Sequence, residues 1–340
     1  MKRRTATRRT RDPLAALPNL PREVGKLLAQ IPAGRVTTYG ALAEALGHVR
    51  AARWVATFLA RHPHRVGCNC HRVVRKDGSL GQYVSGNLAD KAALLQREGI
   101  PVNRGCVNLA ACEPVPLRCT APLAALQEIQ RALIARVSLA PPLEFPRLAA
   151  GVDVSYPAPG MAVGCYTLVD IDRGELVWSI TRRLRVRFPY ITGFLSFREL
   201  PVFRALLAAA RRAQRMADVV LVDGSGLLHP RQAGIATHLG VVENLPTIGV
   251  TKTLLAGQVD RRGIVSGGQR SIRLDDRELG VALRPTEAEG LIYISPGHRV
   301  DVATAAEVCR RLLTGRKLPE PVYWADRLSR QAGASLKRSM

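Results

Sequence analysis

A cysteine and a histidine that adjoin each other are the most reactive pair in the first half of the chain. Cys70 and His71 lie in the segment VGCNCHRVV, at or near a predicted strand that leads into a hairpin turn. A thiol becomes a nucleophile when a neighbouring base takes its proton, and a carboxylate can orient that base. Glu98, in the segment LLQREG, is the candidate carboxylate. The alternative is a buried, unreactive cysteine, which is common in protein cores.

Three acidic residues in the second half stand where they could hold a metal ion. Asp153 follows the apolar run LAAGV, Asp223 follows DVVLV, and Glu199 lies in FREL at the start of a predicted helix. Carboxylates at neighbouring strand ends are the usual means of holding Mg²⁺ or Mn²⁺ beside a phosphodiester. His298, after the run LIYIS, could shuttle protons. The alternative is that these acids are scattered surface residues of an ordinary α/β domain.

Two short amphipathic helices are predicted before the cysteine. Between Thr37 and Gly47 apolar residues recur at helical spacing, with Thr37 or Thr38 as the N-cap and Gly47 as the stop. A second helix, over residues 51–61, carries arginines that include Arg53 opposite its apolar stripe. The pair predicts a helix-turn-helix whose second helix lies against DNA. A helical hairpin with a solvated arginine face has the same pattern.

The second half alternates short apolar runs with helical stretches, which is typical of a mixed α/β sheet domain. Cysteines and prolines break the periodicity between the two halves, and this break favours a linker. We therefore predict four segments along the chain. They are a disordered basic arm over residues 1–13, a small DNA-binding domain over 14–104, a linker over 105–121 and an α/β domain over 122–340.

The composition indicates a polyanionic partner. The 340 residues include 50 Lys and Arg but only 27 Asp and Glu, so the net charge is +23 and nucleic acid is the predicted partner. An arginine-rich composition without a functional cause is the alternative. No apolar run of about 18 residues suggests a membrane helix, and the sequence predicts neither a membrane partner nor an organic cofactor. It does not indicate the oligomeric state.

Seven cysteines without a secretory signal favour a reducing compartment, so we predict a cytoplasmic protein with free thiols. Four of the cysteines, Cys68, Cys70, Cys106 and Cys112, could instead bind a metal. The single residue between the first two is fewer than zinc-binding pairs usually have, which disfavours that alternative.

The segments IPAGRVTTYGALAEALG, AARWV, NCHRVV, GQYVSG and LLQREG occur in this order. Over about residues 14–104 they resemble the C-terminal domain of the O6-alkylguanine-DNA alkyltransferases. The resemblance implies a winged-helix-like domain that binds the minor groove and flips the alkylated guanine out of the stack. It implies that Cys70 accepts the alkyl group stoichiometrically, that His71 is its base through a water, and that Glu98 orients His71. The implied DNA contacts are Tyr39 at a phosphate, Arg53 in the space left by the base, and Tyr83 at the flipped guanine.

The chain departs from that family at several positions. The Pro that usually precedes the reactive cysteine is Asn69, two helical Gly are Ala56 and Thr57, and an expected Asn is His62. Related alkyltransferase-like proteins lack the cysteine and only bind lesions. The presence of Cys70 favours transfer, and binding without transfer is the alternative.

The segments AGVDVSY, FPYITGFLSFRE, DVVLVDGSGLLHPRQAGIATHLGV, PTIGVTKTLL and ISPGHRVDV resemble endonuclease V over about residues 122–320. The resemblance implies a ribonuclease H-like fold with a five-stranded mixed sheet. It also implies a cut at the second phosphodiester 3′ to deoxyinosine, leaving a 3′-hydroxyl and a 5′-phosphate. By this resemblance Asp153, Glu199 and Asp223 bind Mg²⁺, with Mn²⁺ as the alternative, and His298 assists the water or the leaving group.

Further substrate contacts follow from the same resemblance. Lys252 would contact the phosphate near the metal. The segment Pro189, Tyr190 and Ile191 would form a wedge that separates the strands. The hypoxanthine pocket would be lined by Gly224, Gly226, His229, Gly234 and Ile235.

Together these patterns predict an α/β protein in which a small winged-helix-like alkyltransferase domain precedes a ribonuclease H-like mixed-sheet domain. Its predicted partner is damaged DNA that contains deoxyinosine or O6-alkylguanine. Two alternatives concern its function. The first domain could serve only to bring the nuclease to lesions, or the nuclease could prefer inosine in RNA.

Overall fold

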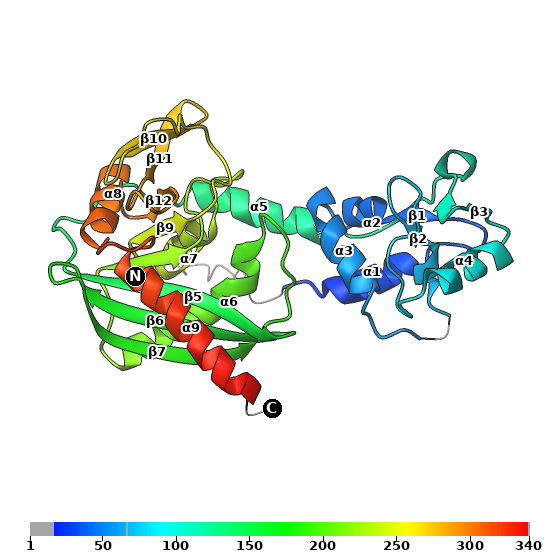
Figure 1. The fold of residues 1–340 in the computed structure, drawn as a ribbon, viewed down its shortest axis with the longest axis horizontal. Helices are drawn as coiled ribbons and strands as arrows, with labels where there is room; N and C mark the ends of the chain where they lie inside the picture. The colour runs from blue at the N-terminus through cyan, green and yellow to red at the C-terminus, as the bar shows by residue number, and fades with distance from the viewer. Residues whose placement is uncertain (1–16, 66, 339–340) are drawn as a thin grey trace, which may run out of the picture.

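A computed structural model describes residues 17–65 and 67–338, and the predicted basic arm over residues 1–13 lies outside them. Two domains lie side by side, and helix α5 (Pro122–Ile134) runs between them (Figure 1). The first domain is small and mainly helical, and the second is built on one large sheet. The prediction of a small helical domain followed by a mixed-sheet α/β domain is confirmed.

The first domain contains the predicted helix pair. Thr38 caps the first helix, because its Oγ1 accepts a hydrogen bond from the Ala41 amide at 3.0 Å. Gly47 follows the end of this first helix, and its φ of +102° is a conformation that favours glycine. The elements are α1 (Leu20–Leu28), β1 (Thr37–Thr38), α2 (Tyr39–Ala45), η1 (Val49–Ala51), α3 (Ala52–Leu59), η2 (Asn69–Arg72), β2 (Val73–Val74) and α4 (Leu88–Arg97), and β1 pairs with β2 in parallel.

The first domain extends beyond the predicted boundary at residue 104. Strand β3 (Val102–Asn103) pairs with β4 (Cys106–Val107), and η3 (Leu109–Ala111) follows. The Val107 amide donates to the Gly78 carbonyl at 2.9 Å, and the Val107 side chain is buried in a core cluster of this domain. The predicted linker over residues 105–121 is therefore too long, because its first part belongs to the first domain.

The second domain contains an eight-stranded sheet in the order β10-β11-β12-β9-β8-β5-β6-β7. Strands β5, β8 and β9 are parallel neighbours, whereas the other pairings are antiparallel. The five strands that the resemblance implied are too few, because antiparallel β10, β11 and β12 extend the sheet on one side. The strands are β5 (Leu148–Ala158), β6 (Met161–Asp170), β7 (Glu175–Arg185), β8 (Val219–Asp223), β9 (Thr247–Thr251), β10 (Gln269–Leu274), β11 (Arg277–Leu283) and β12 (Ile292–His298).

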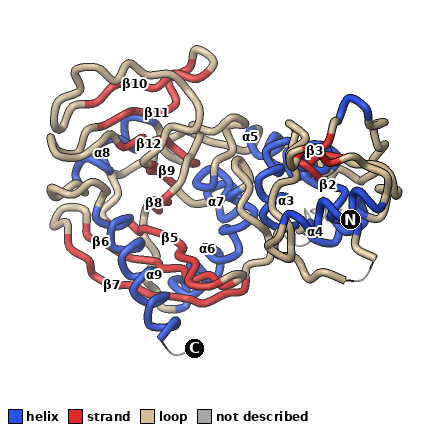
Figure 2. The backbone as a smooth tube through the Cα atoms, turned by 45° about the vertical axis from the view of Figure 1, so that its right-hand side comes forward, coloured by secondary structure: helices blue, strands red, loops and turns tan. Residues whose placement is uncertain are grey.

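Helices cover both faces of the sheet, because β8 is apolar on both of its faces. Val219 and Leu221 join one core cluster, whereas Val220 and Val222 join the other, as the alternation of side chains along a strand requires. On the second of these faces lie α6 (Leu195–Arg212) and α7 (Ile235–Glu243), and on the first lie α8 (Val302–Arg311) and α9 (Glu320–Arg338). Figures 1 and 2 show α9 crossing β5 and β6. Within the described residues no helix has the length and apolarity needed to cross a bilayer.

Helix α5 holds the two domains together. At its start, the Leu123 amide donates to the Leu46 carbonyl of the first domain at 2.8 Å. Further along, the Gln130 amide nitrogen donates to the Gly193 carbonyl of the second domain at 3.1 Å. One apolar cluster includes residues of both domains, so their interface is a packed core and not only a tether. The helix was predicted to belong to the second domain and is shared instead.

Candidate functional site

Two aspartates meet on the central parallel strands, Asp153 in the middle of β5 and Asp223 at the end of β8, so the expected position at a strand end holds only for Asp223. Val152 of β5 pairs in parallel with Val222 of β8, so the residues that follow them, Asp153 and Asp223, lie on neighbouring strands. Both side chains line a cavity of about 450 Å³, together with Asp326 of α9. Sequence reasoning missed Asp326, because it lies within a helix and follows no apolar strand that would mark it.

Glu199 joins these acids from helix α6. Its carboxylate is buried, with 8% of the residue exposed, and its Oε1 accepts a hydrogen bond from the Tyr156 hydroxyl at 2.9 Å. Burial raises the pKa of Glu199 to about 8, and the negative charges of Asp153 and Asp223 act in the same direction. Burial followed by repulsion from Asp223 also raises the pKa of Asp153 to about 6. The positive charges near these acids are too few to hold all of them ionised at neutral pH.

Positively charged side chains near the acids partly offset their negative charge, namely Arg198 beside Glu199, and Lys252 and Arg330 beside Asp223. The Ser329 hydroxyl donates to Asp153 Oδ2 at 3.0 Å, and Lys252 Nζ lies 3.8 Å from Asp223 Oδ2. The pKa of Asp223 is raised by burial even though Lys252 opposes the shift. All the acidic donors here are carboxylate oxygens, the ligands that Mg²⁺ and Mn²⁺ prefer. The residues present therefore fit a hard divalent cation.

A second cavity of about 440 Å³ adjoins the acids and shares Asp223 with the first. It is lined by several predicted substrate residues, namely Gly224, His229, Gly234, Ile235 and Lys252. Burial, with the positive charge of Arg231 in addition, lowers the pKa of His229 to about 3. His229 is therefore neutral at physiological pH and offers hydrogen bonds without charge. Gly226 does not line the cavity; its amide donates to Ser295 Oγ at 2.9 Å, so its role is in packing the loop.

The predicted wedge segment is only partly at the surface. Tyr190 is 64% exposed and stands at the rim of the second cavity. Ile191 is 1% exposed and belongs to the apolar cluster with Phe188 and Phe194, while Pro189 is half-buried. Ile191 therefore anchors the segment, which corrects its assignment to the wedge itself.

His298 does not reach the acids. Its strand β12 pairs with β9, with His298 opposite Thr247, whereas Asp223 pairs with Val250. Three residues of strand separate the two positions, or about 10 Å along the sheet. His298 is buried, and its Nδ1 accepts a hydrogen bond from the Ser138 amide at 3.2 Å. The prediction that His298 assists the water or the leaving group is wrong, because the sheet register places it at the opposite end.

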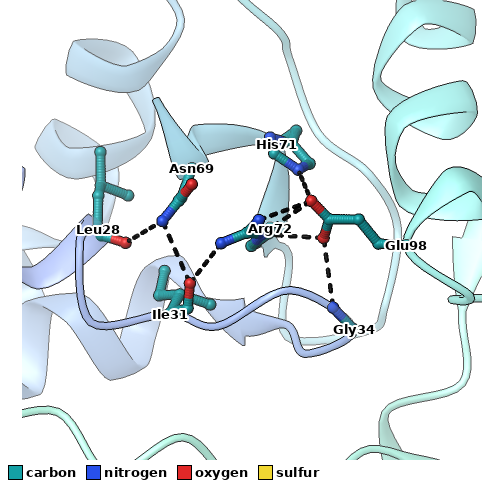
Figure 3. Close-up of polar contacts among 7 residues, drawn as sticks. All are labelled: Leu28, Ile31, Gly34, Asn69, His71, Arg72 and Glu98. Atoms are coloured by element: carbon teal, nitrogen blue, oxygen red, sulfur yellow. Dashed lines mark hydrogen bonds and ion pairs between the residues drawn. The ribbon is translucent and has the colours of Figure 1, made fainter. Parts of the chain in front are cut away.

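Figure 3 shows the histidine and the glutamate of the first domain in contact. His71 Nε2 lies 2.8 Å from Glu98 Oε1, and Arg72 donates to the same carboxylate at 2.7–3.1 Å. Burial opposes ionisation of Glu98, but the hydrogen bonds from Arg72 and His71 outweigh it and lower its pKa to about 2. A carboxylate can only accept, so Nε2 of His71 carries the hydrogen and Nδ1 presents its lone pair.

Cys70 is buried on η2, with 3% of the residue exposed. Its Sγ lies 3.6 Å from Nδ1 of His64 and shares a hydrogen bond with the Cys68 thiol. That bond raises the pKa of Cys70 and lowers the pKa of Cys68. His71 Nδ1 is buried and has no hydrogen-bond partner among the described residues. Cys68 and His64 are thus polar neighbours of the predicted nucleophile. The sequence indicates Cys68 only as a possible metal ligand and does not indicate His64.

The three predicted DNA contacts of the first domain differ in exposure. Arg53 is exposed on α3 and is free to approach a duplex. Tyr83 is 7% exposed and lines a surface cavity of about 520 Å³ together with His64. Tyr39 is equally buried, and its hydroxyl donates to the Gln82 carbonyl at 3.4 Å, so its ring is mainly part of the core.

Comparison with known proteins supports two joined domains. Residues 131–327 match the family model of endonuclease V, and residues 19–100 match the DNA-binding domain of 6-O-methylguanine DNA methyltransferase. A bifunctional methyltransferase/endonuclease from Picrophilus torridus is 33% identical over 286 residues, which are 84% of this chain and 88% of that protein. Endonuclease V from Azotobacter vinelandii is 41% identical over 203 residues, which are 59% of this chain and 90% of that protein.

The sheet domain has the same fold as a solved endonuclease V structure. Endonuclease V from Ciona intestinalis, bound to a DNA that contains an inosine followed by a ribo-adenosine, superimposes with a TM-score of 0.58 at 27% identity. The similarity covers 64% of this chain and 99% of that one. The ribonuclease H-like fold that the sequence predicts is confirmed. The chain belongs to the endonuclease V family, and it carries an alkyltransferase DNA-binding domain ahead of the nuclease, as in the bifunctional methyltransferase/endonuclease.

Proposed function

We propose that the sheet domain cuts DNA next to deoxyinosine in a reaction that depends on Mg²⁺. The observation that carries this proposal is that Asp223 lines both the acidic cavity and the neighbouring cavity. If a DNA base occupied the second cavity, the phosphodiester next to it would lie close to the carboxylates. The inosine-containing DNA bound by the Ciona intestinalis relative supports the choice of base.

Each residue then has a chemical task. Asp153 of β5 and Asp223 of β8 hold the cation, and Glu199 adds a third carboxylate from the side of α6. When bound, the cation stabilises the negative charge that develops on the phosphate. Lys252, at 3.8 Å from Asp223, contacts the same phosphate. His229, Gly234 and Ile235 surround the extruded base without adding charge.

A duplex with a single deoxyinosine tests this proposal, with deoxyadenosine at the same position as the reference substrate. We expect Asp223→Asn to slow cutting by on the order of 100-fold or more, because it removes a ligand and a charge at the reacting phosphate. DNA affinity should be largely kept, since phosphate contacts from Arg and Lys supply most of it. Asp172→Asn, at an exposed turn residue, is the matched control. Normal cutting by Asp223→Asn, or equal cutting of the two duplexes, contradicts the proposal.

The same assay decides between DNA and RNA. Strands of identical sequence, with inosine in a deoxyribose or a ribose backbone, are offered at equal concentration. We expect the DNA strand to be cut faster. Faster cutting of the RNA strand would reassign the substrate while leaving the carboxylate site in place.

We also propose that Cys70 accepts the alkyl group of O6-alkylguanine. The thiol gives up its proton, the thiolate sulfur attacks the alkyl carbon, and the bond from that carbon to O6 breaks. The electron pair stays with the guanine, which takes up a proton at a ring nitrogen and becomes an ordinary guanine. The contact between His71 and Glu98 supports this step, because it fixes a lone pair on Nδ1 that can take a proton. The thioether product makes the reaction stoichiometric.

An intact-mass measurement after incubation with an O6-methylguanine duplex tests the transfer. We expect one methyl group, mapped by peptide analysis to Cys70, and no gain in mass for Cys70→Ala. Cys106→Ala, at an exposed cysteine, should behave like the natural chain. Lesion-selective binding without a gain in mass would make the first domain a binding module that brings the nuclease to DNA.

A further inference from the structure

Two histidines and two cysteines of the first domain converge on one point. His62 and His64 follow helix α3, and Cys68 and Cys70 lie at the start of η2. One ligand atom from each of the four residues lies within 4.8 Å of every other. Within the part of the chain that the structure describes, no other group of three or more His, Cys, Asp or Glu side chains is so compact. The set has the composition of a Cys₂His₂ zinc site.

We propose that His62, His64, Cys68 and Cys70 bind a zinc ion. Bonds of about 2.0–2.3 Å to nitrogen and sulfur in a tetrahedron place neighbouring ligand atoms roughly 3.3–3.8 Å apart. His62 Nε2 lies 3.2 Å from Cys68 Sγ, and His64 Nδ1 lies 3.6 Å from Cys70 Sγ. The second of these distances lies within the required range, and the first is about 0.1 Å shorter than its lower limit. The remaining edges need only small rotations of side chains, because no ligand atom is further than 4.8 Å from another.

The second ring nitrogen of His62 supports this assignment. Its Nδ1 lies 2.9 Å from the Leu59 carbonyl, which can only accept, so Nδ1 carries the hydrogen. Nε2 then presents a lone pair toward Cys68, the form in which a histidine binds a metal. Metal-binding histidines in proteins usually donate their other N–H to a carbonyl or carboxylate in this way. The C-terminal end of α3 therefore fixes both the tautomer and the direction of the first ligand.

The two sulfurs are held by the residue between them. The Asn69 side chain donates to the Leu28 and Ile31 carbonyls, each at 3.2 Å, and this fixes the backbone that carries Cys68 and Cys70 (Figure 3). His62 and Cys70 are buried, whereas His64 is exposed. The site is thus closed on its inner side and open to solvent at His64, which gives an ion a path of entry.

The donor set also selects the ion. Thiolate and imidazole ligands favour zinc over Mg²⁺, Ca²⁺ and Mn²⁺, which prefer oxygen. Two thiolates neutralise a divalent zinc ion, so the charge of the buried site is balanced. The zinc site does not depend on the proposed alkyl transfer, although the two share the Cys70 sulfur. A zinc-bound Cys70 would be a thiolate, and alkylation would convert it to a thioether, a weaker ligand.

Cobalt substitution tests the site in the full-length chain. The protein is reduced, freed of metal with a chelator and titrated with Co²⁺. We expect one equivalent to produce the sulfur-to-cobalt charge-transfer band and the visible bands of a tetrahedral ion, and Zn²⁺ to abolish both. The carboxylate cavity cannot contribute to the charge-transfer band, because its acidic donors are oxygens. Absence of that band contradicts the proposal.

Variants identify the ligands. Loss of partners that only support metal ligands costs roughly 10–100-fold in affinity, so loss of a ligand should weaken Co²⁺ binding by more than about tenfold. We expect this of Cys68→Ser and of His64→Ala, whose exposed side chain can be removed without disturbing the core. Cys106→Ser and His48→Ala are the matched controls, and both should keep the affinity of the natural chain. Equal affinities for His64→Ala and His48→Ala would refute the ligand assignment.

Thiol labelling provides a measurement without variants. Cys68 is partly exposed, so N-ethylmaleimide should modify it in the metal-free chain. Zinc should slow that modification by about tenfold or more, because a bound thiolate is shielded. Cys106 in the same sample is the internal control and should react at an unchanged rate. Equal labelling of Cys68 with and without zinc would overturn the proposal.

Discussion

The buried acids of the nuclease domain make its stability depend on pH in an unusual direction. The pKa of Glu199 is raised to about 8 from an ordinary 4.5 by burial. Between these values the folded chain keeps a proton that the unfolded chain releases, so stability falls as pH rises, by about 1.4 kcal/mol per pH unit. From about pH 5 to about pH 7 this one residue lowers the free energy of unfolding by roughly 3 kcal/mol. For a domain of this size that equals roughly 6–12 °C in Tm.

The experiment compares the natural chain with Glu199→Gln in a chelating buffer. Glutamine keeps the shape and can still accept the hydrogen bond from Tyr156, but it cannot ionise. Melting of the nuclease domain is followed by calorimetry at several pH values, and the difference between the two proteins removes the contribution of other groups. We expect the variant to gain stability relative to the natural chain as pH rises, and Mg²⁺ to reduce that gain. Parallel curves, or a variant that loses relative stability with rising pH, would refute the reasoning.

Three further predictions concern other parts of the molecule. Glu98→Gln should lower the free energy of unfolding of the first domain by about 1–3 kcal/mol, because Arg72 loses a charged partner. The Glu98 pKa of about 2 means that this contribution is present above about pH 4.5 and lost as pH falls toward about 2, measured by acid titration of both proteins. Gly47→Ala should loosen the domain interface, since a Cβ there would lie 2.5 Å from the Ala124 nitrogen at a φ of +102°, and faster hydrogen exchange in α5 would show it. Gly234→Ala should impair cutting at deoxyinosine more than it impairs DNA binding, because its Cβ would enter the loop that lines the base cavity, and parallel cleavage and binding assays separate the two.

Local signals predict the helices and strands of this chain well. Thr38 and Gly47 mark the start and the end of helix α2. Both signals are local, because capping and the glycine preference for positive φ act within a few residues. The continuous apolar run from Val219 to Val222 predicts a strand, and its burial on both faces follows from the absence of polar residues in the run. The strands that extend the sheet, such as β10, are polar on one face and give a weaker signal.

Positions that depend on register or on distant helices were not accessible from the sequence. His298 stands in a motif beside an apolar run, but only the pairing of β12 with β9 shows which end of the sheet it occupies. Asp326 reaches the acidic cavity because α9 crosses β5, a packing that no local pattern encodes. In the sequence, Cys68 and Cys70 are possible metal ligands together with Cys106 and Cys112, but the single residue between the first two disfavours that alternative. The structure instead groups Cys68 and Cys70 with His62 and His64, whose proximity no local spacing rule indicates.

The two proposed metal sites differ in the hardness of their donors, and this difference would let one polypeptide keep two metals apart. The nuclease cavity offers carboxylate oxygens from Asp153, Asp223 and Asp326, whereas the cluster at Cys70 offers sulfur and imidazole nitrogen. Zinc binds most donor sets more tightly than Mg²⁺, so a nuclease with open carboxylates risks being occupied by the wrong ion. A Cys₂His₂ site in the same molecule would take up zinc first, because thiolates bind it more strongly than carboxylates do. We therefore expect limiting zinc to leave Mg²⁺-dependent cutting unchanged up to one equivalent and to inhibit it only beyond that point.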